Sequence, residues 1–199
     1  MRETLAGVEF IILNADDYLA DFSTRFEHLE QDLWKLERQQ EFREPGYPSW
    51  DAFAAGRTEE SLSLAEEERS GIAEFQRGLS VRGIMLHRAR LVASPPTPYL
   101  WWESHILRIR EEAGELIRAV DVEAIASLEA GDWTLPEVVT LGMTVMYLVQ
   151  YDSDGALSGA HRYEQADLVE TWVRFIRQLF DRGEPFGDYY RREIKDVVP

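Results

Sequence analysis

The amino-acid sequence predicts an α+β fold, in which a small mixed or antiparallel sheet is covered by several helices, with long helices near both ends of the chain. Two observations predict it. Near both ends, apolar residues recur every three or four positions, as they do on one face of a helix. Residues 144–151 alternate instead along a stretch that is apolar on both sides, which is typical of a strand inside a sheet.

Composition places limits on the function. The chain has 199 residues, 45% of them hydrophobic, and its 21 basic and 37 acidic side chains give a net charge of −16. We expect one folded domain over residues 1–199. The charge argues against direct binding to nucleic acid and against anionic membranes. Without cysteine, disulfides, thiolate metal sites and cysteine nucleophiles are excluded. The N-terminus lacks the pattern of a signal peptide, so we expect a cytoplasmic protein.

The first long helix is predicted over residues 18–41. Five apolar residues there follow steps of four, three, four and three, which place them on one helical face. They are Phe22, Phe26, Leu29, Leu33 and Leu36. Before this segment, the short run from Phe10 to Leu13 fits either a strand or the start of a helix.

The middle of the chain predicts a loop, two helices and a first strand. Residues 43–62 are interrupted by Pro45 and Pro48 and predict a loop. Ser63 and the glutamate three residues later form a capping-box pattern, which predicts a helix that ends at Gly78. After a β-like stretch, Thr97 followed by proline is typical of an N-cap and a first helical residue.

The sheet is predicted from four segments inside a core over residues 81–163, and a closing helix follows at residues 165–182. The four segments are 81–92, 115–120, 137–151 and 156–163. Asp152, Ser153, Asp154 and Gly155 have the composition of a tight turn between the last two. Two carboxylates in this turn are too few for a calcium site. Residues 186–199 predict an aromatic and then charged tail.

Motifs of common enzymes and cofactor proteins are missing from the sequence. There is no glycine-rich phosphate loop and no nucleophile elbow, and no two of the four histidines have the spacing of helical metal ligands. We therefore predict neither a metal site nor a cofactor.

Chemically reactive side chains concentrate instead between residues 87 and 115. Arg88 and Arg90 lie on a predicted strand, and Tyr99 and Glu103 lie four positions apart on the helix that follows. A buried carboxylate needs a cationic partner, so we expect an arginine to contact Glu103. The predicted ligand-binding residues are Arg88, Arg90, Tyr99, Trp102, Glu103 and Glu115. Two interpretations remain: a structural ion pair beneath aromatic packing, or a pocket for a carboxylate or phosphate.

These residues also carry a family resemblance. Arg88-x-Arg90, Tyr99-x-x-Trp102-Glu103 and Ala113-Gly114-Glu115 resemble an actinobacterial family known only as a domain of unknown function, whose members are often encoded beside helix-turn-helix regulators. The segment Trp34-x-Leu36-Glu37 resembles the opening helix of that family. The resemblance covers about residues 20–190 and implies an α+β fold in a regulatory setting. It implies no catalytic residue.

Three functions follow as hypotheses. The first is a non-enzymatic binding or regulatory module that recognises a small anionic ligand or a protein partner. The second is an enzyme of a natural-product or nucleotide pathway, with Glu103 or His105 as general acid or base. The third is an acidic partner in a two-gene regulatory or toxin–antitoxin pair, which docks a basic or regulatory protein.

Overall fold

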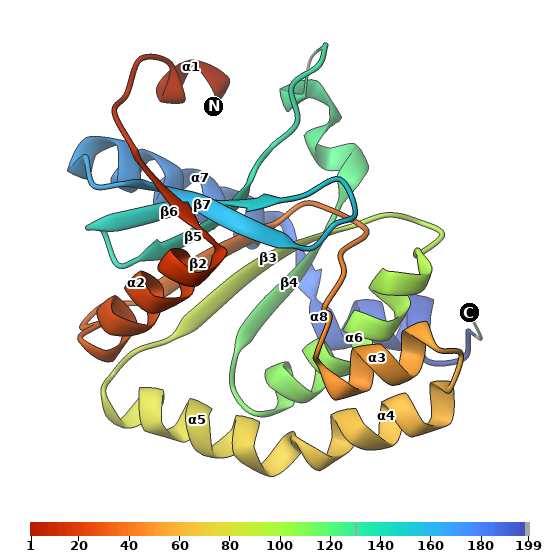
Figure 1. Ribbon diagram of the computed structural model, residues 1–199. Helices are drawn as coiled ribbons and strands as arrows, with labels where there is room; N and C mark the ends of the chain where they lie inside the picture. Colours follow the sequence, from red (N-terminus) through yellow and green to blue (C-terminus); the bar gives the residue numbers. More distant parts are fainter. Residues whose placement is uncertain (130, 198–199) are drawn as a thin grey trace.

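The computed structural model describes residues 1–129 and 131–197 and confirms the α+β fold (Figure 1). In these residues a mixed sheet of eight strands has the order β1-β7-β6-β5-β2-β3-β4-β8. The strands are β1 (Ile11–Asn14), β2 (Leu33–Glu37), β3 (Leu86–Val92), β4 (Leu116–Asp121), β5 (Glu137–Leu141), β6 (Val145–Tyr151), β7 (Leu157–Tyr163) and β8 (Glu184–Pro185). Strands β2, β3 and β4 are parallel, and all other neighbours are antiparallel.

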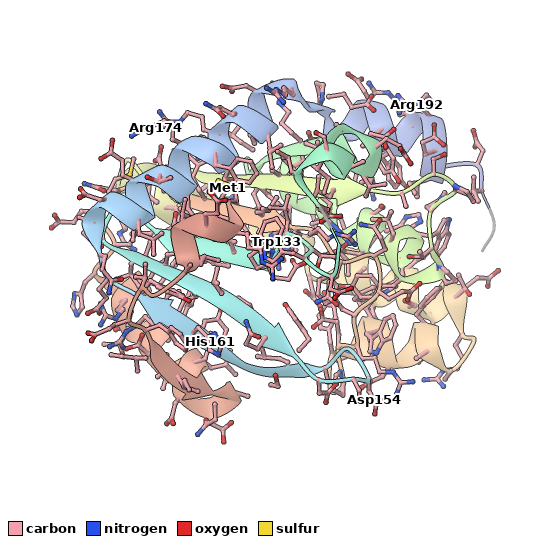
Figure 2. The ribbon with its side chains drawn as sticks, turned by 90° about the horizontal axis from the view of Figure 1, so that it is seen from above. Met1, Trp133, Asp154, His161, Arg174 and Arg192 are labelled. Carbon is pink, nitrogen blue, oxygen red and sulfur yellow. The ribbon has the colours of Figure 1, made fainter. Side chains whose placement is uncertain are left out.

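Helices pack on both faces of the sheet. They are α1 (Arg2–Leu5), α2 (Ala15–Glu27), α3 (Pro48–Ala54), α4 (Thr58–Glu67), α5 (Arg69–Val81), α6 (Pro98–Glu112), α7 (Ala166–Arg182) and α8 (Phe186–Tyr189), with a 3-10 helix η1 (Val122–Leu128) and a π-helical turn η2 (Tyr190–Ile194). One apolar cluster joins α7 to the sheet, and Met1 and Trp133, both labelled in Figure 2, pack against it. On the opposite face α6 and α2 build two further apolar clusters.

Several predicted elements are confirmed. Helix α6 begins at Pro98, and its N-cap Thr97 accepts a hydrogen bond from the backbone N–H of Leu100 at 3.1 Å. The closing helix, predicted at 165–182, is α7. The turn at Asp152 joins β6 to β7, and its carboxylate accepts the backbone N–H of Asp154 at 2.9 Å. The run from Phe10 to Leu13, which fitted a strand or a helix, contributes β1.

The predicted helix over residues 18–41 is wrong in its second half. Helix α2 ends at Glu27, and Leu33 to Glu37 form strand β2. The helical spacing was misleading because β2 lies inside the sheet. Trp34 and Leu36 pack toward α7, while Leu33 packs in the cluster under α2, so apolar residues occur on both sides of the strand.

Other boundaries also differ from the prediction. The sheet extends beyond the predicted 81–163 core, because β1, β2 and β8 lie outside it. The 137–151 segment is two strands joined by a turn, and β3 begins only at Leu86 because α5 continues to Val81. The 43–62 loop contains α3 and the start of α4, and Ser63 lies inside α4 rather than at its cap.

The C-terminal tail folds back onto the domain. Phe186 and Tyr189 of α8 are buried in the cluster built by α6. None of the helices in residues 1–129 and 131–197 combines the length and the hydrophobicity needed to traverse a lipid bilayer.

Candidate functional site

A band of charged side chains crosses the middle of the sheet. In the parallel register Lys35 lies beside Arg88 and Glu37 beside Arg90. In the antiparallel register with β5, Leu36 lies opposite Val138, so Glu37 and Glu137 each lie one position beyond the last registered pair, and the charge of Glu37 acts on Glu137. Directly opposed residues in neighbouring strands project to the same face, so the band faces the layer of α6 and α2. It lies between the apolar cluster of α6 and that of α2. We call Lys35, Glu37, Arg88, Arg90 and Glu137 the charged band.

Arg88 is held between two carboxylates. Its Nε donates to Glu115 Oε1 and its Nη1 donates to Glu37 Oε2, both at 2.7 Å. Burial opposes the charge of Arg88, but Glu115 and Glu37 outweigh burial and raise its pKa. Burial also opposes the ionisation of Glu37, but Arg88 and Lys35 hold its pKa well below the usual range. Arg88 and Glu37 are therefore both ionised at neutral pH.

Arg90 is fully buried and is fixed more tightly still. Its Nε donates to Glu103 Oε2 of α6 at 2.8 Å, and its Nη1 donates to the backbone carbonyls of Gln39 at 2.6 Å and Leu91 at 3.0 Å. Its Nη2 has no hydrogen-bond partner among the described residues. The predicted contact between a strand arginine and Glu103 is thus present, with Arg90 as the partner. This arginine is an internal connector between β3 and α6.

Two aromatic side chains of α6 and a carboxylate from the loop after β2 lie next to the charged band. Tyr99 donates its hydroxyl to Glu44 Oε1 at 3.1 Å, and its ring lies 5.4 Å from that of Trp102. Trp102 Nε1 donates to Ser49 Oγ of α3 at 3.0 Å. Burial raises the pKa of Glu44, and the hydrogen bond from Tyr99 opposes this increase.

A pocket of about 380 Å³ opens over this cluster. Its lining includes the side chains Lys35, Glu37, Glu44, Tyr47, Arg88, Tyr99, Trp102, Glu103 and Arg110. We call it the β2 pocket. Arg88 Nη2 donates to no described residue, and the side chains of Lys35 and Arg110 are 30% and 33% exposed. Lys35 Nζ lies 2.5 Å from Glu37 Oε1 and Arg110 Nη1 lies 3.7 Å from Glu115 Oε2, so both cations are paired but still partly exposed, whereas the Arg88 side chain is only 11% exposed.

A comparison with models of protein families identifies the family to which this chain belongs. The model of a family described as "Domain of unknown function (DUF6879)" matches residues 20–191. The chain belongs to this family. The match includes every strand of the charged band and all residues that line the β2 pocket. No match was found among curated proteins.

In this DUF6879 domain the two candidate catalytic residues point in different directions. Glu103 and His105 are two positions apart on α6, which places them on nearly opposite sides of the helix. Glu103 is bonded to Arg90, whereas His105 Nδ1 lies 2.9 Å from the hydroxyl of Tyr190 in the C-terminal segment. Burial lowers the pKa of His105 to about 4. The geometry does not bring the two residues to one reacting centre.

Glu137 is the least satisfied carboxylate of the charged band. Its Oε1 accepts the backbone N–H groups of Arg38 at 2.9 Å and Gln39 at 2.7 Å, while its Oε2 has no partner among the described residues. Burial raises its pKa to about 7. Within residues 1–129 and 131–197, no three histidine, aspartate or glutamate side chains are grouped as metal ligands.

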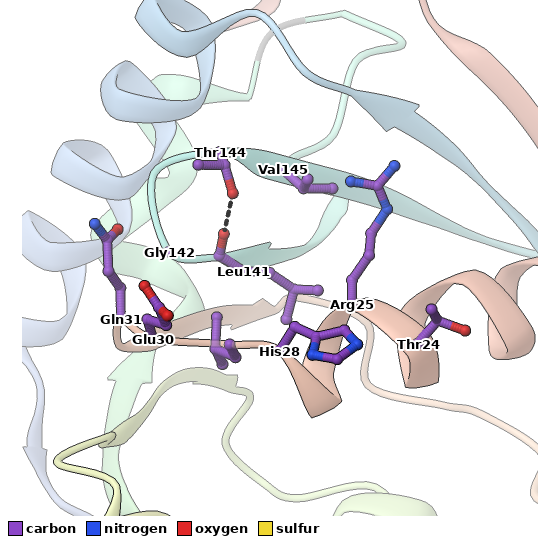
Figure 3. A pocket seen from close by; sticks show the side chains of 10 residues that line it. Thr24, Arg25, His28, Glu30, Gln31, Leu141, Gly142, Thr144 and Val145 are labelled. Atoms are coloured by element: carbon purple, nitrogen blue, oxygen red, sulfur yellow. Dashed lines mark hydrogen bonds between the residues drawn. The ribbon is translucent and has the colours of Figure 1, made fainter.

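A second cavity, of about 330 Å³, lies away from the charged band at the C-terminal end of α2 (Figure 3). Arg25 and His28 line one side, and the turn between β5 and β6 lines the other, where Thr144 donates its hydroxyl to the carbonyl of Leu141 at 3.1 Å. None of the six predicted ligand-binding residues lines this cavity.

The six predicted residues therefore converge in one part of the DUF6879 domain, and four of them line the β2 pocket. Arg90 and Glu115 lie behind its wall. Sequence reasoning missed Lys35 and Glu37 because they were assigned to a helix. The signal that identifies them is their alternation with the apolar Trp34 and Leu36, which is the period of a strand.

Proposed function

We propose that this protein is a non-enzymatic binding module that recognises a small anionic ligand in the β2 pocket. The observation that carries the proposal is the combination of Arg88 Nη2, which donates to no described residue, with the accessible side chains of Lys35 and Arg110 in one pocket. Guanidinium and ammonium groups are the usual donors to carboxylates and phosphates.

The ion pairs behind the pocket favour binding because they fix the donors in advance. Glu115 and Glu37 hold Arg88 through two hydrogen bonds of 2.7 Å, so this side chain loses little conformational freedom when a ligand arrives. The raised pKa of Glu44 makes the charge of this carboxyl group easier to suppress when an anion enters beside it.

The size and walls of the pocket favour a small ligand. Tyr47 is partly exposed beside the cationic groups, whereas Tyr99 and Trp102 are only 3% and 2% exposed. A volume of about 380 Å³ is typical of pockets for small metabolites. We therefore expect a compact carboxylate or phosphate that meets a single aromatic ring, that of Tyr47.

The contacts of the two alternative acid–base candidates favour binding rather than catalysis, because Glu103 is bonded to Arg90 and His105 to Tyr190. Glu103 is engaged by Arg90, and proton transfer to it would leave a buried guanidinium without its anionic partner. A regulatory role is part of the proposal and depends on the resemblance to a family whose members are often encoded beside helix-turn-helix regulators.

The experiment is a thermal-shift screen with small carboxylates and phosphates, followed by calorimetric titration of each stabilising compound. A ligand at about one hundred times its Kd adds about 2.7 kcal/mol of stability. Lys35→Gln and Arg110→Gln should each weaken binding without unfolding the protein, because both side chains are partly exposed. Arg174→Gln, in an exposed pair on α7, is the matched control. The absence of any stabilising compound, or equal binding by all three variants, contradicts the proposal.

A further inference from the structure

The outer edge of the sheet carries apolar residues that no other part of the described chain covers. Strand β1 pairs with β7 on one side, and no described strand pairs with its other side. Phe10, Ile11 and Ile12 are 43%, 47% and 74% exposed. An open strand edge has unpaired backbone N–H and C=O groups, and exposed apolar side chains on it favour the addition of another strand.

The apolar surface extends over both faces of this edge. On one face, Phe10 stacks on His161 with ring centroids 4.4 Å apart, and Ile12 lies opposite the same histidine in the register (His161 is labelled in Figure 2). On the other face, Ile11 is exposed and lies two positions before the partly buried Leu13. A strand added to β1 would meet apolar side chains on both of its own faces.

The edge is held in position before any partner binds. Gly159 of β7 lies opposite Asn14, and a Cβ at this glycine would lie 2.1 Å from the carbonyl oxygen of Leu13, so the missing side chain permits close pairing of β1 with β7. Asn14 also caps α2, because its side-chain oxygen accepts the backbone N–H of Asp17 at 2.9 Å. A fixed strand edge binds with a smaller entropic cost than a mobile segment.

Charge decides which kind of strand fits. Glu9 and Asp16 lie on either side of β1, and Asp17 follows in α2, whereas the next acidic residue, Asp21, is paired with Arg25 and Arg162. In an antiparallel pair of two copies, Glu9 of one copy would approach Asp16 of the other, and each copy has a net charge of −16. A second copy is therefore disfavoured, whereas a strand with basic flanks is complementary.

The geometry points to a docking function for this edge. The open side of β1 binds an extended segment of a basic partner protein, in which alternating apolar residues are flanked by lysine or arginine, and this segment adds a further strand to the sheet. The inference is independent of the β2 pocket, because none of the residues of β1, α2 and β7 that carry it lines that pocket.

The test uses a displayed library of short random peptides, selected on the purified protein. The enriched peptides should alternate apolar residues and carry lysine or arginine at their ends. Ile12→Lys should raise their Kd by about tenfold or more, since it removes apolar contact and adds a like charge. Val81→Lys, at a highly exposed residue at the end of α5, is the control and should leave the Kd unchanged.

A second variant separates the electrostatic contribution from damage to the fold. Glu9→Lys changes only an exposed flank, and it should weaken binding and make the Kd less sensitive to salt. Enriched peptides without the predicted pattern, or equal affinity for wild type, Ile12→Lys and Glu9→Lys, would overturn the inference. Sedimentation that reveals a wild-type dimer dissociated by Ile12→Lys would also overturn it, because the occupant would then be a second copy.

Discussion

Arg90 and Glu103 join the centre of the sheet to helix α6 through a hydrogen bond of 2.8 Å between Arg90 Nε and Glu103 Oε2. Both residues are buried, and burial without a partner is costly for either charge. The pair therefore fixes how α6 lies on β3, and with it the wall of the β2 pocket.

Removal of one member of this pair should be strongly destabilising. We expect Arg90→Met to lower the free energy of unfolding by about 3–5 kcal/mol, because Glu103 would remain buried without its cation. The double variant Arg90→Met with Glu103→Leu should recover most of this loss. Urea denaturation followed by circular dichroism measures both. Arg174→Met, in an exposed ion pair, should change stability by less than about 0.5 kcal/mol, and a loss as large as that of Arg90→Met would contradict the argument.

Two buried tryptophans should differ in their tolerance of phenylalanine. Trp102 Nε1 donates to Ser49 Oγ at 3.0 Å, whereas Trp172 Nε1 has no partner among the described residues. Trp102→Phe should therefore cost about 1 kcal/mol more than Trp172→Phe, since only the first substitution removes a hydrogen bond. Chemical denaturation of the two variants under identical conditions gives the comparison. Equal costs would show that the hydrogen bond to Ser49 contributes no net stability.

Gly159→Ala should weaken the attachment of β1. The backbone at this position has φ +149°, and an added Cβ would lie 2.1 Å from the carbonyl oxygen of Leu13. We expect faster amide hydrogen exchange in β1 and β7 and a stability loss of roughly 1–3 kcal/mol. Gly71→Ala in α5, where an added Cβ meets no atom within 4 Å, is the control and should be neutral or stabilising. Unchanged exchange in β1 of Gly159→Ala would refute the prediction.

Glu137 should make the protein less stable as the pH rises toward neutrality. Burial raises the folded-state pKa of this carboxyl group from its ordinary 4.5 to about 7, so between these values the folded state binds more protons than the unfolded state. Stability is then lost as the pH rises through the folded pKa. At about 1.4 kcal/mol for each pH unit, the difference amounts to roughly 3 kcal/mol.

The measurement is urea denaturation of wild type and Glu137→Gln between about pH 5 and pH 8. The variant should become the more stable of the two as the pH rises, because glutamine has no charge to bury. The histidines with lowered pKa values are present in both proteins, so their opposite pH dependence cancels in the difference. Parallel stability curves would show that Glu137 does not titrate in this range.

Strong local signals predicted several elements correctly. The cap at Thr97 and the proline after it determine the start of α6 from backbone chemistry alone. Alternation in β6 and the turn at Asp152 predict a hairpin without any distant contact. The contact between a strand arginine and Glu103 followed from the cost of burying a carboxylate.

Strand β2 shows where local signals were insufficient. Its apolar residues contact α7 on one face and the cluster of α2 on the other, so their spacing in the sequence also matched a helix. Lys35 and Glu37 are charged positions in the middle of a sheet, where the ion pairs of Glu37 with Lys35 and Arg88 cannot be read from the chain itself. The omission of Lys35 and Glu37 from the predicted site follows from this one error.

By itself, the amino-acid sequence determined the α+β class, the start of α6, and the contact between a strand arginine and Glu103. Only the tertiary structure shows that β2 lies between β5 and β3 in the sheet and that Arg90 joins β3 to α6. It also shows that Lys35, Arg88 and Arg110 line a common pocket. The physical reason is that caps and turns depend on neighbouring residues, whereas strand order and ion pairing depend on contacts between residues far apart in the chain.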